Sequence, residues 1–297
     1  MSKKILDQDT SKKAPEQEML IANLLFREKP AKAEPDAIKA ALEELVGTVE
    51  IVSGKKEINM FAVPKYKAVF KDTPQGMPVL ANIGAPREFS PDIVDELNRS
   101  QFWDYPNGSE AIDGFKYCVD VFGMLSGALH YKEQAQFFLD MIDAALRSYP
   151  SCEAIYVFAS GKLTTPEDFE HCKQFDLAGR FIRLAVNGRF FTINNSDDMI
   201  VDTLGFYAFG AADVQLHFHD IDPNHAVEYV YNIASYQFNN EFPVKSGETI
   251  DGIDGNGRIA MDIQWRAQYE NSLIQPIRTV LDINCGRYAA GQRGNCR

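Results

Sequence analysis

Hydrophobic residues recur along the chain with two different spacings, one typical of helices and one typical of strands. Over residues 36–45, Ile38, Leu42 and Leu45 recur at intervals of three and four, which predicts an amphipathic helix with one buried face. The same spacing predicts helices in other segments. These are residues 93–97, 131–149 and 225–238, and a short helix that starts after Thr165 as its N-cap.

Strand segments are marked by apolar runs or by strict alternation. Over residues 259–269, Met261, Ile263 and Trp265 alternate with polar residues, which predicts a strand with one buried face. Pro64 predicts a bulge or an edge within its strand. The other predicted strands are residues 19–26, 49–52, 58–70, 79–83, 115–125, 154–159, 181–186, 199–209 and 214–218.

The order of these elements indicates the fold class. It reads β-α-β-β-β-α and then β-α-β-α-β-β-β-α-β. Strands and helices neither alternate strictly nor segregate, which favours an α+β fold over a doubly wound parallel sheet. We therefore expect mixed, largely antiparallel sheets with packed helices.

The two ends of the chain differ in composition from its middle. Residues 1–17 are polar and poor in aromatic side chains, which predicts a disordered arm. Residues 284–297 carry three arginines and no acid, which predicts a flexible basic tail. Residues 18–283 are expected to form the globular unit, with a sub-boundary near the polar segment 98–114.

Composition places the protein in the cytoplasm. No run approaches the ~20 apolar residues needed to span a membrane, and acids follow the start of the chain where a signal peptide is apolar. The five cysteines form no C-x-x-C pair, which favours free thiols over disulfides or structural zinc.

The chain is acidic. It contains 42 acidic against 30 basic residues, a formal net charge of −12. Such a surface repels phosphate backbones and anionic lipids, so nucleic-acid and membrane partners are disfavoured. A protein partner is expected, and a basic one suits this charge.

One cluster could carry chemistry. His217, His219 and Asp220 could form a weak metal site where a strand meets a helix. The spacing departs from the H-x-H-x-D-H signature of metallo-β-lactamase-like hydrolases, because Pro223 stands in place of the next histidine. Strand alternation, with Asp222 as helix N-cap and Pro223 at the first helical position, explains the cluster without a metal. No cofactor is expected.

Polar residues also alternate along two strands. If the two strands were neighbours, their polar residues would form one broad face, either solvated or receiving a partner. The candidate face consists of Asp213, Gln215, Asp262, Gln264, Arg266 and Gln268.

Four short segments carry a family resemblance. They are residues 154–161 (AIYVFASG), 202–210 (DTLGFYAFG), 231–236 (YNIASY) and 246–252 (SGETIDG). Through them, residues from about 42 to 283 resemble a bacterial family catalogued as a domain of unknown function, number forty-two sixty-one. The resemblance implies a bacterial cytosol and one structural unit. It supplies no activity, cofactor or catalytic residues.

Two functions are consistent with the sequence. The first is a non-catalytic cytoplasmic binding or regulatory protein, such as an immunity or adaptor protein, acting through protein–protein contacts. The alternative is a metal-assisted hydrolase centred on residues 217–225. The sequence contains no Walker A, G-x-S-x-G, H-E-x-x-H or G-x-G-x-x-G motif, which together with the acidity favours the first function.

Overall fold

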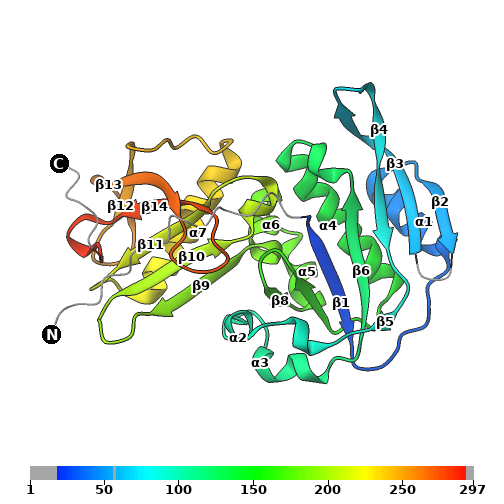
Figure 1. Ribbon diagram of the computed structural model, residues 1–297, viewed down its shortest axis with the longest axis horizontal. Coiled ribbons are helices and arrows are strands. Elements are labelled where there is room, and N and C mark those ends of the chain that lie inside the picture. Colours follow the sequence, from blue (N-terminus) through cyan, green and yellow to red (C-terminus); the bar gives the residue numbers. More distant parts are fainter. Residues whose placement is uncertain (1–18, 56–57, 292–297) are drawn as a thin grey trace. The chain divides into compact units, whose positions relative to one another are not determined.

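The computed structural model describes residues 19–55 and 58–291 (Figure 1). The chain divides into two units, which we call unit 2 (residues 19–185) and unit 1 (described from residue 186 to 291). The division does not fall near residues 98–114, where a sub-boundary was expected. That segment packs onto the sheet of unit 2 through Phe102 and Ile112, which are buried in its core.

Unit 2 is built on an eight-stranded antiparallel sheet. The strand order is β2-β3-β4-β6-β1-β7-β8, and β5 pairs with β6. The strands are β1 (Ile21–Phe26), β2 (Glu50–Lys55), β3 (Ile58–Phe70), β4 (Thr73–Ile83), β5 (Arg87–Glu88), β6 (Tyr117–Met124), β7 (Ala154–Val157) and β8 (Lys162–Thr164).

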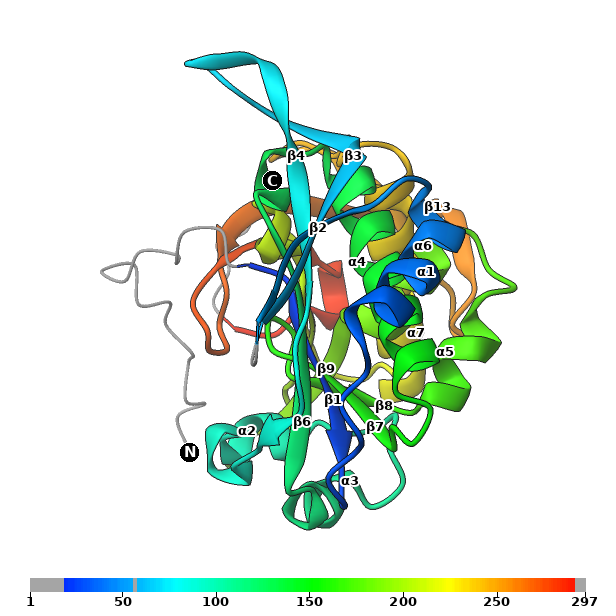
Figure 2. The same ribbon diagram turned by 90° about the vertical axis from the view of Figure 1, so that its right-hand side faces the viewer.

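Helices cover one face of this sheet (Figure 2). They are α1 (Pro35–Val46), α4 (Tyr131–Ser148), α5 (Pro166–Cys172) and α6 (Leu177–Ala185). The other face is partly covered by a segment with α2 (Glu96–Arg99), α3 (Gly108–Ala111) and the 3-10 turns Pro91–Ile93 and Ile112–Gly114.

The central helix α4 lies very close to the sheet. Its Phe137 ring packs on Tyr66 of β3, with ring centroids 5.1 Å apart. A Cβ atom at Gly123 of β6 would lie 2.8 Å from Phe137, so this strand position must be glycine for the helix to approach.

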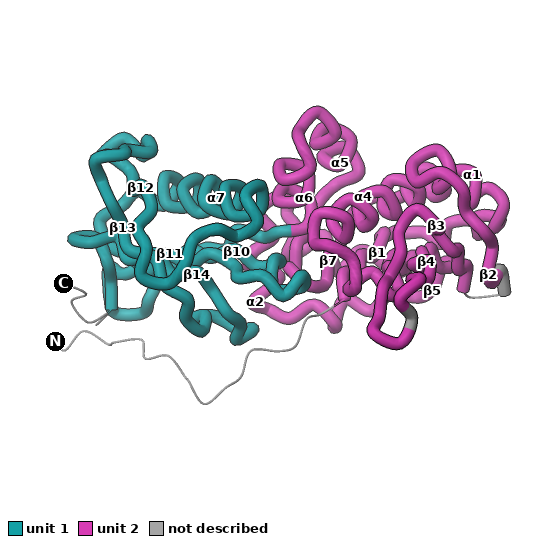
Figure 3. The backbone as a smooth tube through the Cα atoms, turned by 90° about the horizontal axis from the view of Figure 1, so that it is seen from above, with its two compact units in different colours: residues 1–18, 186–297 teal, residues 19–185 magenta. Residues whose placement is uncertain are grey.

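Unit 1 contains a six-stranded sheet in the order β12-β13-β14-β11-β10-β9. All its strand pairs are antiparallel except β11 with β14. The elements are β9 (Asn187–Thr192), β10 (Met199–Leu204), β11 (Asp213–Phe218), α7 (Pro223–Asn239), β12 (Thr249–Ile253), β13 (Ile259–Asn271) and β14 (Thr279–Asn284). Helix α7 covers one face of this sheet (Figure 3).

The observed architecture confirms the α+β fold with largely antiparallel sheets. The predicted strand over residues 181–186 is wrong, because residues 177–185 form α6. Its apolar residues Phe181, Ile182 and Leu184 are buried on a helix that packs against α4 and α5. The predicted helix over residues 93–97 is also wrong: a 3-10 turn ends there, and α2 begins after an Asp95 cap.

The expected C-terminal tail is not free where the structure describes it. Cys285 and Ala290 are 1% and 2% exposed. The Ala290 N–H donates to the His217 carbonyl, and the His219 N–H donates to the Tyr288 carbonyl. The prediction of a flexible tail from residue 284 is therefore wrong up to residue 291, because this segment pairs beside the end of β11. Residues 292–297 and the arm expected over 1–17 lie outside the described residues.

Helix length and polarity also bear on membranes. Over residues 19–55 and 58–291, every helix is too short or too polar to cross a bilayer.

Candidate functional site

The histidine–acid cluster lies at the end of β11, before α7. His217 is 2% exposed near the end of β11, and His219 Nδ1 lies 2.7 Å from Oδ2 of the neighbouring Asp220. Throughout the described chain, no group of three His, Cys, Asp or Glu side chains is placed to hold a metal ion.

Asp222 begins α7, as its N-cap position predicts. Its carboxylate accepts the N–H groups of Asn224 at 2.9 Å and His225 at 3.4 Å. These backbone hydrogen bonds hold the pKa of Asp222 below its usual value. The capping interpretation of this residue is confirmed.

The polar face expected from strand alternation is present, but its strands are arranged differently. Strand β14 lies between β11 and β13, so the two polar strands are not neighbours. The register aligns Gln268, Asp282, Gln215 and Asp202 in one row across four strands. Residues opposite each other on adjacent strands share a face, so this row is one face of the sheet.

The expectation that Asp213 and Gln215 are exposed on this face is wrong. Both are 0% exposed. The Gln215 amide donates to Asp282 Oδ1 at 2.9 Å, and its oxygen accepts the Leu273 N–H at 2.8 Å. Both ends of the Gln215 amide are therefore occupied within the protein.

Two arginines and two aspartates form a buried network on the same face, under residues 272–278. Arg189 makes two hydrogen bonds to Asp202, at 2.9 and 2.6 Å, and Arg278 bridges Asp202 at 2.8 Å and Asp213 at 3.0 Å. Their side chains are 0–1% exposed. We call Arg189, Asp202, Asp213 and Arg278 the Arg–Asp network.

Asp202 keeps its charge although it is excluded from water, whereas burial raises the pKa of Asp213 despite the neighbouring Arg278. Burial acts to raise the pKa of Asp202, but the charges and hydrogen bonds of Arg189 and Arg278 outweigh burial, so this pKa is lowered. Residues 272–278 close the network from above, since the Gln275 carbonyl accepts Arg189 Nη1 at 2.7 Å. The network stabilises the fold and does not bind a solute, because its side chains are 0–1% exposed.

The rest of the polar face is open. Asp262 and Gln264 are exposed on β13, and Arg266 and Gln268 are partly buried. Gln264 Nε2 donates to Asp251 Oδ1 of β12 at 2.6 Å, which ties the two strands together. We call Asp262, Gln264, Arg266 and Gln268 the β13 strip.

The opposite face of β13 explains why the strip points outward. Trp265 is 4% exposed and packs edge-on against Tyr229 of α7, with ring centroids 4.9 Å apart. Anchoring of this residue to the helix turns its neighbours Gln264 and Arg266 to the other side.

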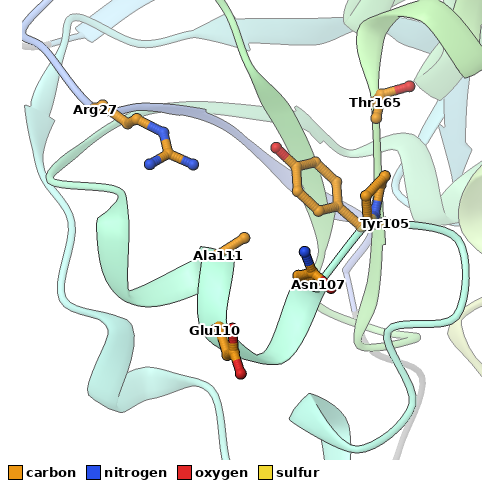
Figure 4. Close-up of a pocket in the computed structure, with 7 residues that line it drawn as sticks. Arg27, Tyr105, Asn107, Glu110, Ala111 and Thr165 are labelled. Carbon is orange, nitrogen blue, oxygen red and sulfur yellow. The ribbon is translucent and has the colours of Figure 1, made fainter.

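Unit 2 contains a shallow cavity of about 420 Å³ that is lined by polar and apolar groups (Figure 4). Arg27, at its rim, pairs through Nε with Glu153 Oε2 at 3.0 Å. The Tyr105 hydroxyl donates to the Glu153 carbonyl at 3.4 Å, and burial raises the pKa of Tyr105. The lining residues are Arg27, Tyr105, Pro106, Asn107, Glu110, Ala111 and Thr165.

One hydroxyl group that lines the cavity is already engaged within the protein. The Thr165 hydroxyl is engaged with Asp168 in the capping box of α5, at 2.6 and 3.0 Å. Sequence reasoning missed the cavity because its residues come from three separate stretches of the chain without a shared motif.

The buried thiols are poor nucleophiles. Burial raises the pKa of Cys118, Cys152 and Cys285 to about 12. These thiols are therefore protonated at neutral pH, and the thiolate that nucleophilic catalysis requires is scarce.

The Arg–Asp network and the β13 strip lie almost entirely within one stretch of chain that is similar to a known family. Residues 202–284 match Domain of unknown function (DUF4261). The resemblance to this family is confirmed there, and three of the four resembling segments lie inside the match. Residues 154–161 lie outside it.

The matched region spans β10 to β14 and includes both halves of the polar face. Of the residues in the Arg–Asp network and the β13 strip, Arg189 alone precedes it. No curated protein and no solved structure matches the chain.

Proposed function

We propose that the protein is a non-catalytic cytoplasmic binding or regulatory protein, of the kind that immunity and adaptor proteins represent. It acts through protein–protein contacts at the β13 strip. One observation carries the proposal: residues 272–278 close the polar face over β10 and β11, whereas Gln264 on this face, and Asp262 in the irregular part of β13 beside it, are exposed.

The charge around the strip favours a basic partner. Four acids and two arginines lie on the strip or on the segments beside it, which leaves the surface negative, as the whole chain is. Opposite charge steers association and sets orientation. The acids are Glu248, Asp251, Asp254 and Asp262, and the arginines are Arg258 and Arg266.

Two apolar side chains at the start of β13, where its pairing with β12 is irregular, are also exposed and support a protein partner. Met261 is 83% exposed and Ile259 is 46% exposed, both at the start of β13. Exposed methionine and isoleucine beside polar groups provide the apolar centre that protein interfaces use. A partner that covers them removes this surface from water.

The proposal is tested by affinity capture from the cells in which the protein occurs. The strip variant Asp262→Arg with Gln264→Arg is compared with wild type and with Glu228→Arg plus Asn232→Arg. The control pair is exposed on α7 and receives the same substitutions. We expect a specific partner with wild type and with the α7 variant, and its loss with the strip variant. Retention of that partner by the strip variant contradicts the proposal.

A further inference from the structure

Strands β3 and β4 extend beyond their neighbours as a two-stranded arm (Figure 2). Pairing of β3 with β2 ends at Ala62, and pairing of β4 with β6 begins at Leu80, in the part of the chain that the structure describes. We call residues 64–78 the ribbon. An isolated two-stranded ribbon is only marginally stable in water, so its length requires an explanation.

The base of the ribbon is anchored, whereas its far part is exposed. Tyr66 packs on Phe137 of α4, and Ala68 is 0% exposed. Beyond them, Val69, Phe70 and Met77 are 58%, 42% and 46% exposed. The ribbon therefore holds apolar side chains in water on a fixed support.

The two outer edges of the ribbon differ. Strand β4 carries Pro74 and Pro78, which lack an N–H group and interrupt any further pairing at that edge. Strand β3 has no proline from residue 65 to residue 70. The register of β3 against β4 shifts between Val63 and Lys67, beside Pro64, and again between Ala68 and Phe70. The outer edge of β3 nevertheless keeps every N–H group from residue 65 to residue 70, so it is the edge that can pair with another strand.

The charge of the ribbon is opposite to that of the chain. It carries Lys65, Lys67 and Lys71 against one acid, Asp72, whereas the chain has a net charge of −12. Lysines on an edge strand oppose pairing between two copies of the same edge. An acidic strand removes that repulsion by charge complementarity.

A lipid surface fits this arrangement less well than a protein. The turn at the far end of the ribbon begins with Lys71 and Asp72, so charged groups lead and the apolar residues follow along the shaft. Segments that enter a bilayer interface bury their apolar side first.

We propose that the outer edge of β3, from Lys65 to Phe70, accepts an extended acidic segment of a partner protein as an added antiparallel strand. Backbone hydrogen bonds supply affinity, and the lysines and Val69 select acidic and apolar side chains. This edge belongs to unit 2, whereas the β13 strip belongs to unit 1. An experiment can therefore contradict the proposal for one surface without affecting the proposal for the other.

The test uses a short labelled peptide of alternating glutamate and valine with the whole protein. Binding is followed by fluorescence anisotropy, and the contacted segment by amide hydrogen exchange. We expect salt-sensitive binding that protects residues 65–70. N-methylation of the peptide backbone removes its strand hydrogen bonds and keeps its charge, so we expect affinity to fall about tenfold or more.

Two variants separate a specific edge from general electrostatics. Lys65→Glu with Lys67→Glu is expected to weaken binding about tenfold or more. Lys29→Glu with Lys116→Glu changes the net charge equally at other exposed positions, and binding is expected to persist. Strip variants at Asp262 and Gln264 are also expected to keep peptide binding, which separates this proposal from the proposed function.

Several outcomes overturn the proposal. They are equal binding of the N-methylated peptide, equal weakening by the control variant, or protection outside residues 65–70. Absence of peptide binding, with protection of residues 65–70 by vesicles of anionic phospholipid, shows a membrane contact and overturns it as well.

Discussion

The two halves of the polar face in unit 1 follow the same sequence rule and have opposite fates. On β11, Asp213 and Gln215 alternate with apolar residues and are fully buried. On β13, Asp262 and Gln264 alternate in the same way and are exposed. Residues 272–278 cause the difference, because they donate and accept hydrogen bonds over the first half alone.

The comparison shows what a polar residue on a strand contributes. Where the face is closed, each charge has several partners, and its loss leaves other charges unpaired in a dry interior. Where the face is open, water already solvates the charge, and its loss costs little stability. The closed half therefore holds the fold, and we propose that the open half contacts a partner.

The largest expected effect is in the closed half. Arg278→Ala leaves Asp202 and Asp213 without their shared guanidinium, which bridges them at 2.8 and 3.0 Å. We expect the free energy of unfolding to fall by about 3–5 kcal/mol in urea denaturation. A loss similar to that of an exposed substitution would remove the distinction between the two halves.

A buried acid whose pKa is raised by burial sharpens the comparison. Asp140 of α4 is 6% exposed, and burial raises its pKa to about 6, although Gln136, Lys65 and Arg180 act to lower it. The folded state thus binds this proton more tightly than the unfolded chain. This raises the free energy of unfolding below about pH 4, and that contribution is lost as pH rises from about 4 to about 6 and the buried carboxyl ionises.

Asp140→Asn removes the cost of this ionisation. We expect the variant to be more stable than wild type by about 2–3 kcal/mol near pH 8, with the gain vanishing near pH 4. Urea denaturation across this range measures the difference. A gain that does not depend on pH would show that ionisation of Asp140 is not its cause.

Asp222 lies between the two extremes, because it is exposed but accepts two backbone N–H groups. Asp222→Ala is expected to lower the urea midpoint, and Asp222→Asn to lower it less, since asparagine also caps helices. A chelator should change neither result. If both substitutions lower the urea midpoint equally, and a chelator lowers wild type to the same midpoint, Asp222 is a metal ligand.

The smallest effect is expected in the open half. Asp262→Ala should change the free energy of unfolding by less than about 0.5 kcal/mol, because water replaces the contacts of an exposed carboxylate. Chemical denaturation measured beside Arg278→Ala provides the comparison. A cost above 1 kcal/mol would mean that the strip serves the fold.

Sequence patterns identified the elements with a single clear period. Helices α4 and α7 and strands β3 and β11 lie where spacing placed them, and Asp222 caps α7. The run at residues 181–186 misled because it is only part of α6, which begins at Leu177; the helical spacing of Arg180 and Arg183 shows only when the whole segment is considered.

The candidate site was only partly predictable. Alternation assigned Asp213 and Gln215 to one face, but it does not say what covers that face. The covering residues, 272–278, lie about sixty positions further along the chain, and β14 separates the two strands. Arg189 and Arg278 have no local pattern that reports their pairing with Asp202.

The central claim is that the open half of the polar face contacts a partner, and site-specific photo-cross-linking tests it most directly. A photoreactive amino acid is placed at Gln264 and, as a control, at Glu228 on the exposed side of α7. We predict a discrete cross-linked protein from position 264 and none from position 228, in the cells in which the protein occurs. No product from position 264, or the same product from both positions, would contradict the account.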